Sequence, residues 1–307
     1  MEGINNLGST CAINSLIQMI CRCKKLCDII LTADVSEGTF TYELKEVIDL
    51  IVNQNKSVNP MKFINFFYTT FNGIFNRYEQ IDINELWFYV YEKINEETSI
   101  QYNENNNNNE YDTTMAIYNN HKKSNIMNLV QGAFINAIQC SNCKYNSHLY
   151  EPFITFALDI QENKSIADLI SITLNDEIRE QDEWICDNCK NNHNYLKIKR
   201  IKKLPEILII SLNRFKDIYN KNNTDVFVND KLIFNADGNI YNYELQSMGL
   251  HFGNLLGGHY MAVCNINNES FNLYNDDSVK VINKDDFIKN NLLNNSVYLI
   301  IYQLNRL

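Results

Sequence analysis

Hydrophobic residues recur at helical spacing through the first third of the chain. The apolar positions that follow Cys11 are three or four residues apart, which predicts a helix that runs through about Cys27. The same spacing from Leu44 to Ile51 predicts a second helix. Both patterns have polar residues between the apolar ones, so each helix should bury a single face.

Two further helices are predicted by the residues at their starts. In "NPMKFINFF", Asn59 is suited to the N-cap and Pro60 to the first helical position. In "DINELWFYVYEKI", Asp82 and Glu85 have the spacing of a capping box. The first part of the chain is therefore expected to be helical.

The remainder is rich in short runs of β-branched and aromatic residues. One predicted helix, "SIADLISITL", lies among them, and the low-complexity segment 103–110 reads as a surface loop. The predicted strands are 153–160, 195–201, 206–212, 259–266 and 296–304. Helices followed by strands indicate an α+β fold.

Composition and charge exclude some classes of protein. The 307 residues carry a formal net charge of −10, which disfavours nucleic acid as the partner and permits a neutral or basic protein. No apolar run is long enough to span a membrane, and the N-terminus lacks the pattern of a signal peptide. We therefore expect an intracellular protein, in the cytoplasm or nucleus, without a separate targeting domain.

Four of the nine cysteines form two C-x-x-C pairs, and four thiolates suit a tetrahedral zinc ion. The wide separation of the pairs places each on a different hairpin. Because four cysteines leave no open coordination position, one structural zinc per chain is expected. His193 and His148 are alternative ligands, more simply interpreted as solvated loop residues. The predicted ligands are Cys140, Cys143, Cys186 and Cys189.

Cys11 is the candidate nucleophile. It opens a predicted helix, where the macrodipole favours the thiolate, and a nearby imidazole would lower the thiol pKa further. Cys21, Cys23 and Cys27 lie inside or at the end of the same helix and lack that field. They are interpreted as packing residues.

His259 is the candidate base. It follows Gly257 and Gly258 at the start of a predicted strand, and the two glycines would let a substrate backbone approach closely. This arrangement is consistent with a Cys–His protease but does not by itself establish one.

A polar turn after the next short strand could orient the imidazole. Its candidates are Asn275, Asp276 and Asp277. Because successive strand residues face opposite sides, Asn275 and Asp276 should not both point at the ring. Asp277 is expected to be a solvated turn residue. The alternative is an ordinary polar β-turn, and the residues alone leave the two readings open.

A series of motifs in order along the chain resembles those of the ubiquitin-specific protease family. "GINNLGSTCAINSLIQ" is similar to its Cys box and "QIDINEL" to its Gln-Gln-Asp-x-x-Glu-Phe segment. "GAFINAIQCSNC" with "WICDNC" resembles its zinc-binding fingers, and "LPEILIISLNRF" its strand before the His box. "HFGNLLGGHYMAVCN" and "LYNDDSV" resemble the His and Asn/Asp boxes, and "SVYLIIYQL" the closing strand. Together they cover nearly the whole chain.

The resemblance implies a papain-like fold shaped like a hand. A single catalytic domain, 1–307, would comprise a helical thumb at about 1–130 and zinc-braced fingers with the first palm strands at about 131–203. The β-rich palm would follow at about 204–307. The implied partners are ubiquitin and ubiquitinated proteins, and the oligomeric state stays open.

The resemblance also implies hydrolysis of the (iso)peptide bond after the C-terminal glycine of ubiquitin. By position, Cys11 is the nucleophile, His259 the base and then acid, and Asn275 the orienter. Asn6 matches the oxyanion-hole amide, and Asp276 a second acidic position.

Four residues are implied to bind substrate. Asp82 matches a position that contacts the ubiquitin tail, although it also serves as the helix cap already described. Gly257, Gly258 and Tyr260 are assigned to substrate binding within the His box. Alternatives are a protease for a ubiquitin-like modifier and a non-catalytic ubiquitin-binding module.

Ser9, Ala12 and Phe271 depart from the family pattern. None of them is an attacking, proton-transfer or orienting group, so these departures bear on how the ubiquitin tail packs against the enzyme. The insertion at 98–112 also departs from a minimal catalytic core.

Overall fold

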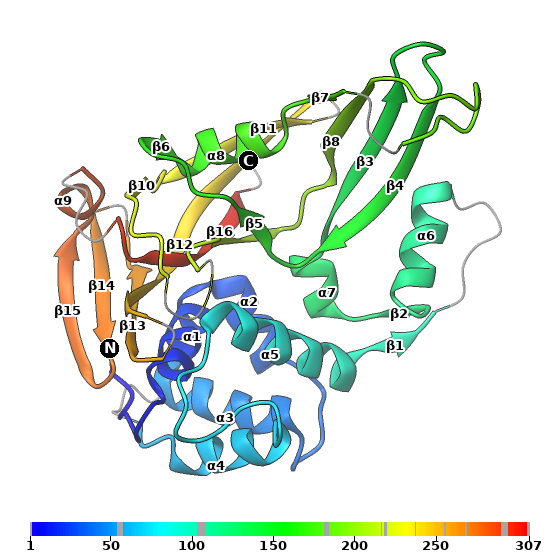
Figure 1. Cartoon of the computed structure of the whole chain (residues 1–307). Helices are drawn as coiled ribbons and strands as arrows, with labels where there is room; N and C mark the ends of the chain where they lie inside the picture. Colours follow the sequence, from blue (N-terminus) through cyan, green and yellow to red (C-terminus); the bar gives the residue numbers. More distant parts are fainter. Residues whose placement is uncertain are drawn as a thin grey trace.

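Helices and strands segregate along the chain as the sequence predicts (Figure 1). The computed structural model describes residues 2–53, 58–102, 109–180, 184–215, 217, 220–236, 238–254, 256–267, 269–289 and 294–305. Most of the predicted loop at 103–110 lies outside these residues. No described helix is long and apolar enough to cross a membrane.

The helices are α1 (Cys11–Arg22), α2 (Lys24–Leu31), α3 (Phe40–Val52), α4 (Met61–Thr70), α5 (Ile83–Thr98), α6 (Glu110–Tyr118), α7 (Asn125–Val130), α8 (Ile166–Thr173) and α9 (Lys284–Lys289). The predicted helix from Cys11 to about Cys27 is wrong in one respect, because the chain is extended at Cys23 and divides it into α1 and α2. The α4 cap is Pro60, with the Asn59 side chain accepting from the Met61 amide.

The strands of the large sheet are β5 (Phe156–Leu158), β9 (Ile207–Leu212), β11 (Lys231–Ala236), β12 (Asn239–Gly253), β13 (Gly258–Asn265), β14 (Ser270–Asn275), β15 (Ser278–Asn283) and β16 (Val297–Asn305). Their order is β15-β14-β13-β12-β16-β9-β5, with β11 paired to β12. All neighbours are antiparallel except β5 and β9. This sheet corresponds to the expected palm.

The strands of a second sheet, here called the finger sheet, are β3 (Gly132–Cys140), β4 (Asn146–Phe153), β7 (Glu177–Arg179) and β8 (Tyr195–Lys203). The order is β4-β3-β8-β7. The remaining short pairs are β1 (Ile100–Gln101) with β2 (Lys122–Lys123), and β6 (Lys164–Ser165) with β10 (Val226–Phe227). The finger sheet projects beyond the large sheet in Figure 1.

Helix α1 is the central helix of the core. All but one of its residues are buried, and it packs against β13 and β12 of the large sheet. Gly249 of β12 gives α1 room, because a Cβ there would lie 3.2 Å from the sulfur of Met19. The sheet therefore fixes where the N-terminus of α1 lies relative to β13 and β14.

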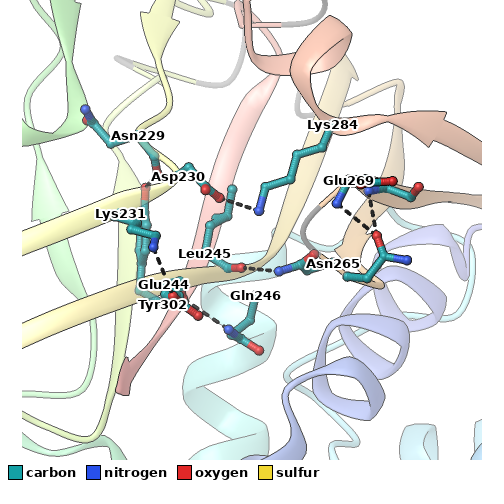
Figure 2. Close-up of polar contacts among 12 residues, drawn as sticks. Asn229, Asp230, Lys231, Glu244, Leu245, Gln246, Asn265, Glu269, Lys284 and Tyr302 are labelled. Atoms are coloured by element: carbon teal, nitrogen blue, oxygen red, sulfur yellow. Dashed lines mark hydrogen bonds and ion pairs between the residues drawn. The ribbon is translucent and has the colours of Figure 1, made fainter. Parts of the chain in front are cut away.

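A polar cluster braces the far ends of the strands (Figure 2). The buried Lys284 side chain places Nζ 2.6 Å from the Asp230 carboxylate, and the Asp230 carbonyl accepts from the Leu245 amide. The Asn265 side chain donates to the Leu245 carbonyl at 3.1 Å, close to the irregular pairing between Leu245 and Ser247. These contacts join α9, β12 and β13, so they hold the strand that carries His259.

The finger sheet is fastened at its base and along one side. Phe134 and Phe153 stack with ring centroids 4.3 Å apart where the sheet meets the large sheet. Helix α6 lies beside β4, with Tyr111 edge-on to Tyr150. The described part of the 98–112 insertion thus begins a helix that contacts the fingers.

Candidate active site and metal centre

Cys11 is the first residue of α1, and a loop held by Asn6 leads into it. The Oδ1 atom of Asn6 accepts from the Gly8 amide at 2.9 Å and from the Thr10 hydroxyl at 3.1 Å. The backbone is left-handed at Ser9, with φ of 53°, so the chain turns sharply before the helix begins. Asn6 therefore shapes the approach to the nucleophile.

The Cys11 thiol is almost fully buried, and burial raises its pKa. The backbone N–H of Tyr260 opposes this by hydrogen bonding to the sulfur, while the nearby Asp276 carboxylate raises the pKa further. We expected the start of the helix to favour the thiolate. The largest effect on the thiol pKa is desolvation, which acts in the opposite direction because the charged form loses its hydration.

His259 and Asn275 are hydrogen-bonded, with 2.6 Å between Nε2 of the imidazole and Oδ1 of the amide. His259 lies near the start of β13, and Asn275 is the last residue of the neighbouring β14. An amide oxygen accepts only from a protonated ring nitrogen, so this bond assigns the proton to Nε2. Nδ1 is then the nitrogen able to take a proton.

Asp276 points away from the imidazole, as the alternation of side chains predicted. One carboxylate oxygen accepts from Asn6 Nδ2 at 2.9 Å and the other from Asn14 Nδ2 at 2.7 Å. Its φ of 52° is in the left-handed region, which Asp tolerates better than most residues. Asp276 thus joins the loop before Cys11 to Asn14, the fourth residue of α1.

Asp82 caps α5 and also contacts the large sheet. Its carboxylate accepts from the Asn84 and Glu85 amides at 2.8 and 3.0 Å, and from the Tyr298 hydroxyl at 2.6 Å. Burial raises the pKa of Glu85. Both acidic residues line a hollow of about 880 Å³ between α5, the end of α6 and β4.

The three His-box residues assigned to substrate binding have different surroundings. A Cβ on Gly257 would meet only the Asn254 side chain, at 3.9 Å, so this glycine leaves open space. A Cβ on Gly258 would lie 2.2 Å from His251, so close packing inside the protein requires that glycine. The Tyr260 side chain is buried, and only its backbone contacts Cys11.

The two C-x-x-C pairs meet at the tip of the finger sheet. Their four sulfurs lie within 4.8 Å of one another and could hold a metal ion. The Cys140 and Cys189 sulfurs are 4.0 Å apart, and those of Cys143 and Cys186 are 3.5 Å apart. A tetrahedral ion with metal–sulfur distances of about 2.3 Å would separate its ligands by about 3.8 Å, so the spacing fits.

The two turns that carry these cysteines have the same backbone geometry. Lys144 and Lys190 each follow the second cysteine with a left-handed φ, 59° and 55°. Each donates its amide to the first cysteine's carbonyl, at 3.0 and 2.8 Å. Each pair belongs to its own hairpin, as expected, and the sulfurs converge because the turns are matched.

Sequence reasoning missed three residues of the site. Asn14 holds Asp276, Tyr298 holds Asp82, and the buried His251 packs beside Gly258. A polar residue three positions after Cys11 on a buried helix was the available signal for Asn14. Tyr298 gave none, because its strand lies far along the sequence from Asp82. His251 opens the His-box segment itself, so the motif was the available signal for it.

Known proteins share both the sequence and the fold. The chain matches the family described as "Ubiquitin carboxyl-terminal hydrolase" over residues 2–302. It is 23% identical to ubiquitin carboxyl-terminal hydrolase Usp2 of Drosophila melanogaster, over 98% of this chain and 34% of that protein. It is 27% identical to ubiquitin carboxyl-terminal hydrolase 12 of Salmo salar, over 91% of this chain and 81% of that one.

A solved chain of the SAGA DUB module Ubp8/Sgf11/Sus1/Sgf73 bound to monoubiquitin shares the fold, with a TM-score of 0.81 at 20% identity. The alignment covers 100% of this chain and 70% of that chain. The chain spans about a third of the length of the fly relative, 34%. Because the family match extends over nearly all of the sequence, the chain belongs to the ubiquitin carboxyl-terminal hydrolase family.

Proposed function

We propose that this chain is a deubiquitinating thiol protease that hydrolyses the bond after the C-terminal glycine of ubiquitin. The observation that carries the proposal is the 2.6 Å bond between His259 and Asn275. It fixes the imidazole tautomer, which a Cys–His–Asn protease requires. Cys11 starts a buried helix, and its sulfur accepts from the backbone N–H of Tyr260, the residue after His259. The family relationship supports the choice of substrate.

In the proposed reaction His259 Nδ1 accepts the Cys11 proton, and the thiolate attacks the glycine carbonyl. Burial raises the pKa of Cys11, so the imidazole has to take up the thiol proton to supply the attacking thiolate. His259 then protonates the departing lysine amine. Water activated by the same histidine releases ubiquitin from the thioester.

Asn6 supplies the proposed oxyanion donor. One N–H of its side-chain amide donates to Asp276, and the loop holds its oxygen, so the second N–H has a fixed direction. A donor fixed in advance stabilises developing negative charge without reorganising during the reaction. Asp276 acts here as a positioning residue for Asn6, and Asn275 does so for His259.

Substrate binding is proposed for the hollow beside α5. It is lined by Asp82, Glu85 and Glu92 and by residues at the base of β4. An acidic wall suits a basic partner segment, and the hollow between α5 and β4 can receive one part of the surface of a folded modifier. We assign Gly257 to the passage of the ubiquitin tail, because no neighbouring atom fills the space above it.

The metal proposed for the four-cysteine cluster is one structural zinc ion. Zinc is the usual partner of four thiolates, and the sulfur spacing fits a tetrahedron. The ion would tie the tips of two hairpins together and supply no chemistry to the reaction. An intracellular location is proposed with it, because cysteines stay reduced there and available to a metal ion.

The direct test is incubation with ubiquitin bearing a C-terminal electrophile, followed by mass spectrometry. We expect one adduct per chain, on Cys11, and none in Cys11→Ala. Probes made from ubiquitin-like modifiers are the matched comparison. Labelling by one of those and not by ubiquitin would replace the proposed substrate, and labelling by none would contradict the protease function.

A further inference from the structure

Two separate hollows lie on opposite sides of the end of α1 that carries Cys11. The first is the 880 Å³ hollow beside α5, and the second is a groove of about 490 Å³ between residues 5–7 and 275–278. They share no lining residue. In Figure 1, α5, α6 and β4 lie to the right of α1, whereas the N-terminus and the β14–β15 turn lie to its left.

We infer that this second groove binds the leaving-group side of the substrate and selects conjugates in which the ubiquitin-bearing lysine lies in a basic segment. The inference rests on the proposed function, because it presupposes cleavage after ubiquitin's last glycine. It adds which residues are preferred around the lysine on the other side of the scissile bond.

The location follows from which residues border each hollow. Asn6 and Asn275, which flank the reacting atoms in the proposed mechanism, line the second groove and not the first. The scissile carbonyl must lie between the Cys11 sulfur and the Asn6 amide. With the modifier seated against the larger hollow, the chain beyond the scissile bond leaves past Asn6 and enters the groove.

The lining of the groove is polar and acidic. Asn5, Asn6, Asn275 and Ser278 can hydrogen-bond an extended polypeptide, and no lysine or arginine lines it. The Asp276 carboxylate is occupied by Asn6 and Asn14, at 2.9 and 2.7 Å.

Asp277 carries the charge available for recognition. It is exposed, and among the described residues its carboxylate has no hydrogen-bond or ion-pair partner. A lysine or arginine beside the scissile lysine would gain a charge partner there, whereas an acidic residue would be repelled.

The turn that presents Asp277 is fixed in place. Asn275 pairs with Ser278 across the β14–β15 hairpin, and the Ile4 amide donates to the Asp276 carbonyl at 2.9 Å. Gly3 packs so closely that a Cβ there would lie 2.4 Å from the Asp277 backbone. A backbone held this way loses little freedom when a substrate binds, so even one exposed carboxylate can bias selection.

The test compares kcat/KM on ubiquitin joined through an isopeptide bond to the central lysine of short peptides. One peptide has arginines flanking that lysine, one has alanines and one has glutamates, and each rate is divided by that for a ubiquitin–fluorophore conjugate. We expect the arginine peptide to exceed the alanine peptide by about two- to fivefold at low salt, the range for an exposed charge pair. The preference should shrink as salt is added.

Asp277→Asn should abolish the preference, and Asp277→Lys should reverse it in favour of the glutamate peptide. Glu162→Lys is the charge-matched control, because Glu162 is exposed just before β6 and lines neither hollow. That variant should retain the wild-type preference. Equal rates for the three peptides, or a preference unchanged in Asp277→Lys, would overturn this inference while leaving the proposed function standing. Failure to cleave even the fluorophore conjugate would overturn both.

Discussion

The Asp276 carboxylate accepts a hydrogen bond from the side-chain amide of Asn6, with 2.9 Å between Oδ2 and Nδ2. The adjacent Asn275 instead contacts His259, at 2.6 Å. Two consecutive residues of one turn therefore hold the two sides of the proposed reaction centre. One fixes the oxyanion donor, and the other fixes the base.

Asn6→Ala should lower the rate of acylation by about 10²–10³ with little change in ubiquitin affinity, because an oxyanion donor acts mainly in the transition state. Single-turnover kinetics, together with binding measured in a Cys11→Ala background, separates the two effects. A variant whose only defect is weaker binding would reassign Asn6 to a structural role.

Asp276→Ala should reduce turnover at least about tenfold, which is roughly 1.4 kcal/mol in barrier, and should do so through Asn6. The double variant Asn6→Ala/Asp276→Ala should then lose little more than Asn6→Ala alone, since residues that share one contact are not additive. Additive losses would show that Asp276 acts independently of Asn6.

Asn275→Ala should also reduce turnover at least about tenfold, because the imidazole loses the partner that sets its tautomer. Asn275→Asp keeps an acceptor and should retain more activity than the alanine variant. Turnover of a ubiquitin–fluorophore conjugate is the measurement, with circular dichroism to confirm folding. An alanine variant with wild-type turnover would exclude Asn275 as the orienter.

The reactivity of Cys11 should depend on pH in a direction set by its surroundings. Burial and the Asp276 carboxylate raise the thiol pKa, so alkylation of the free protein should accelerate as the pH increases toward that pKa. Asp276→Asn removes a nearby negative charge, which lowers the pKa and moves the profile to lower pH. The rate of alkylation of the Cys11 peptide, measured by mass spectrometry from about pH 6 to about pH 10, gives the profile. A shift to higher pH would contradict the assignment of the charge effect.

The purified protein should contain one zinc ion per chain. In small peptides, structural zinc contributes an apparent ~10–16 kcal/mol to the free energy of folding. The large core here should keep most of the fold without the ion. Cys186→Ser should therefore weaken ubiquitin binding more than it lowers the melting temperature. Cys264→Ser, a buried cysteine outside the cluster, is the matched control. Elemental analysis that finds no metal in protein purified without chelator would refute the proposal.

The order of elements follows from local properties of the chain. Helical spacing after Cys11, the cap at Asp82 and the β-rich runs each act over a few residues, so the α+β class is predictable from sequence. The limit of such reasoning is visible at Cys23, where the apolar pattern continues but the backbone is extended. Periodicity alone therefore does not locate the break between α1 and α2.

The sequence by itself determined which chemical groups are present: a cysteine at a helix start, a histidine after two glycines, a polar turn and four paired thiols. Only the tertiary structure decided which of them meet. Asn6 and Asp276 lie 270 positions apart and bond because the N-terminal segment packs against the β14–β15 turn. Burial in the packed chain likewise raises the Cys11 pKa. Long-range contacts and desolvation are properties of the packed chain, and no window of sequence contains them.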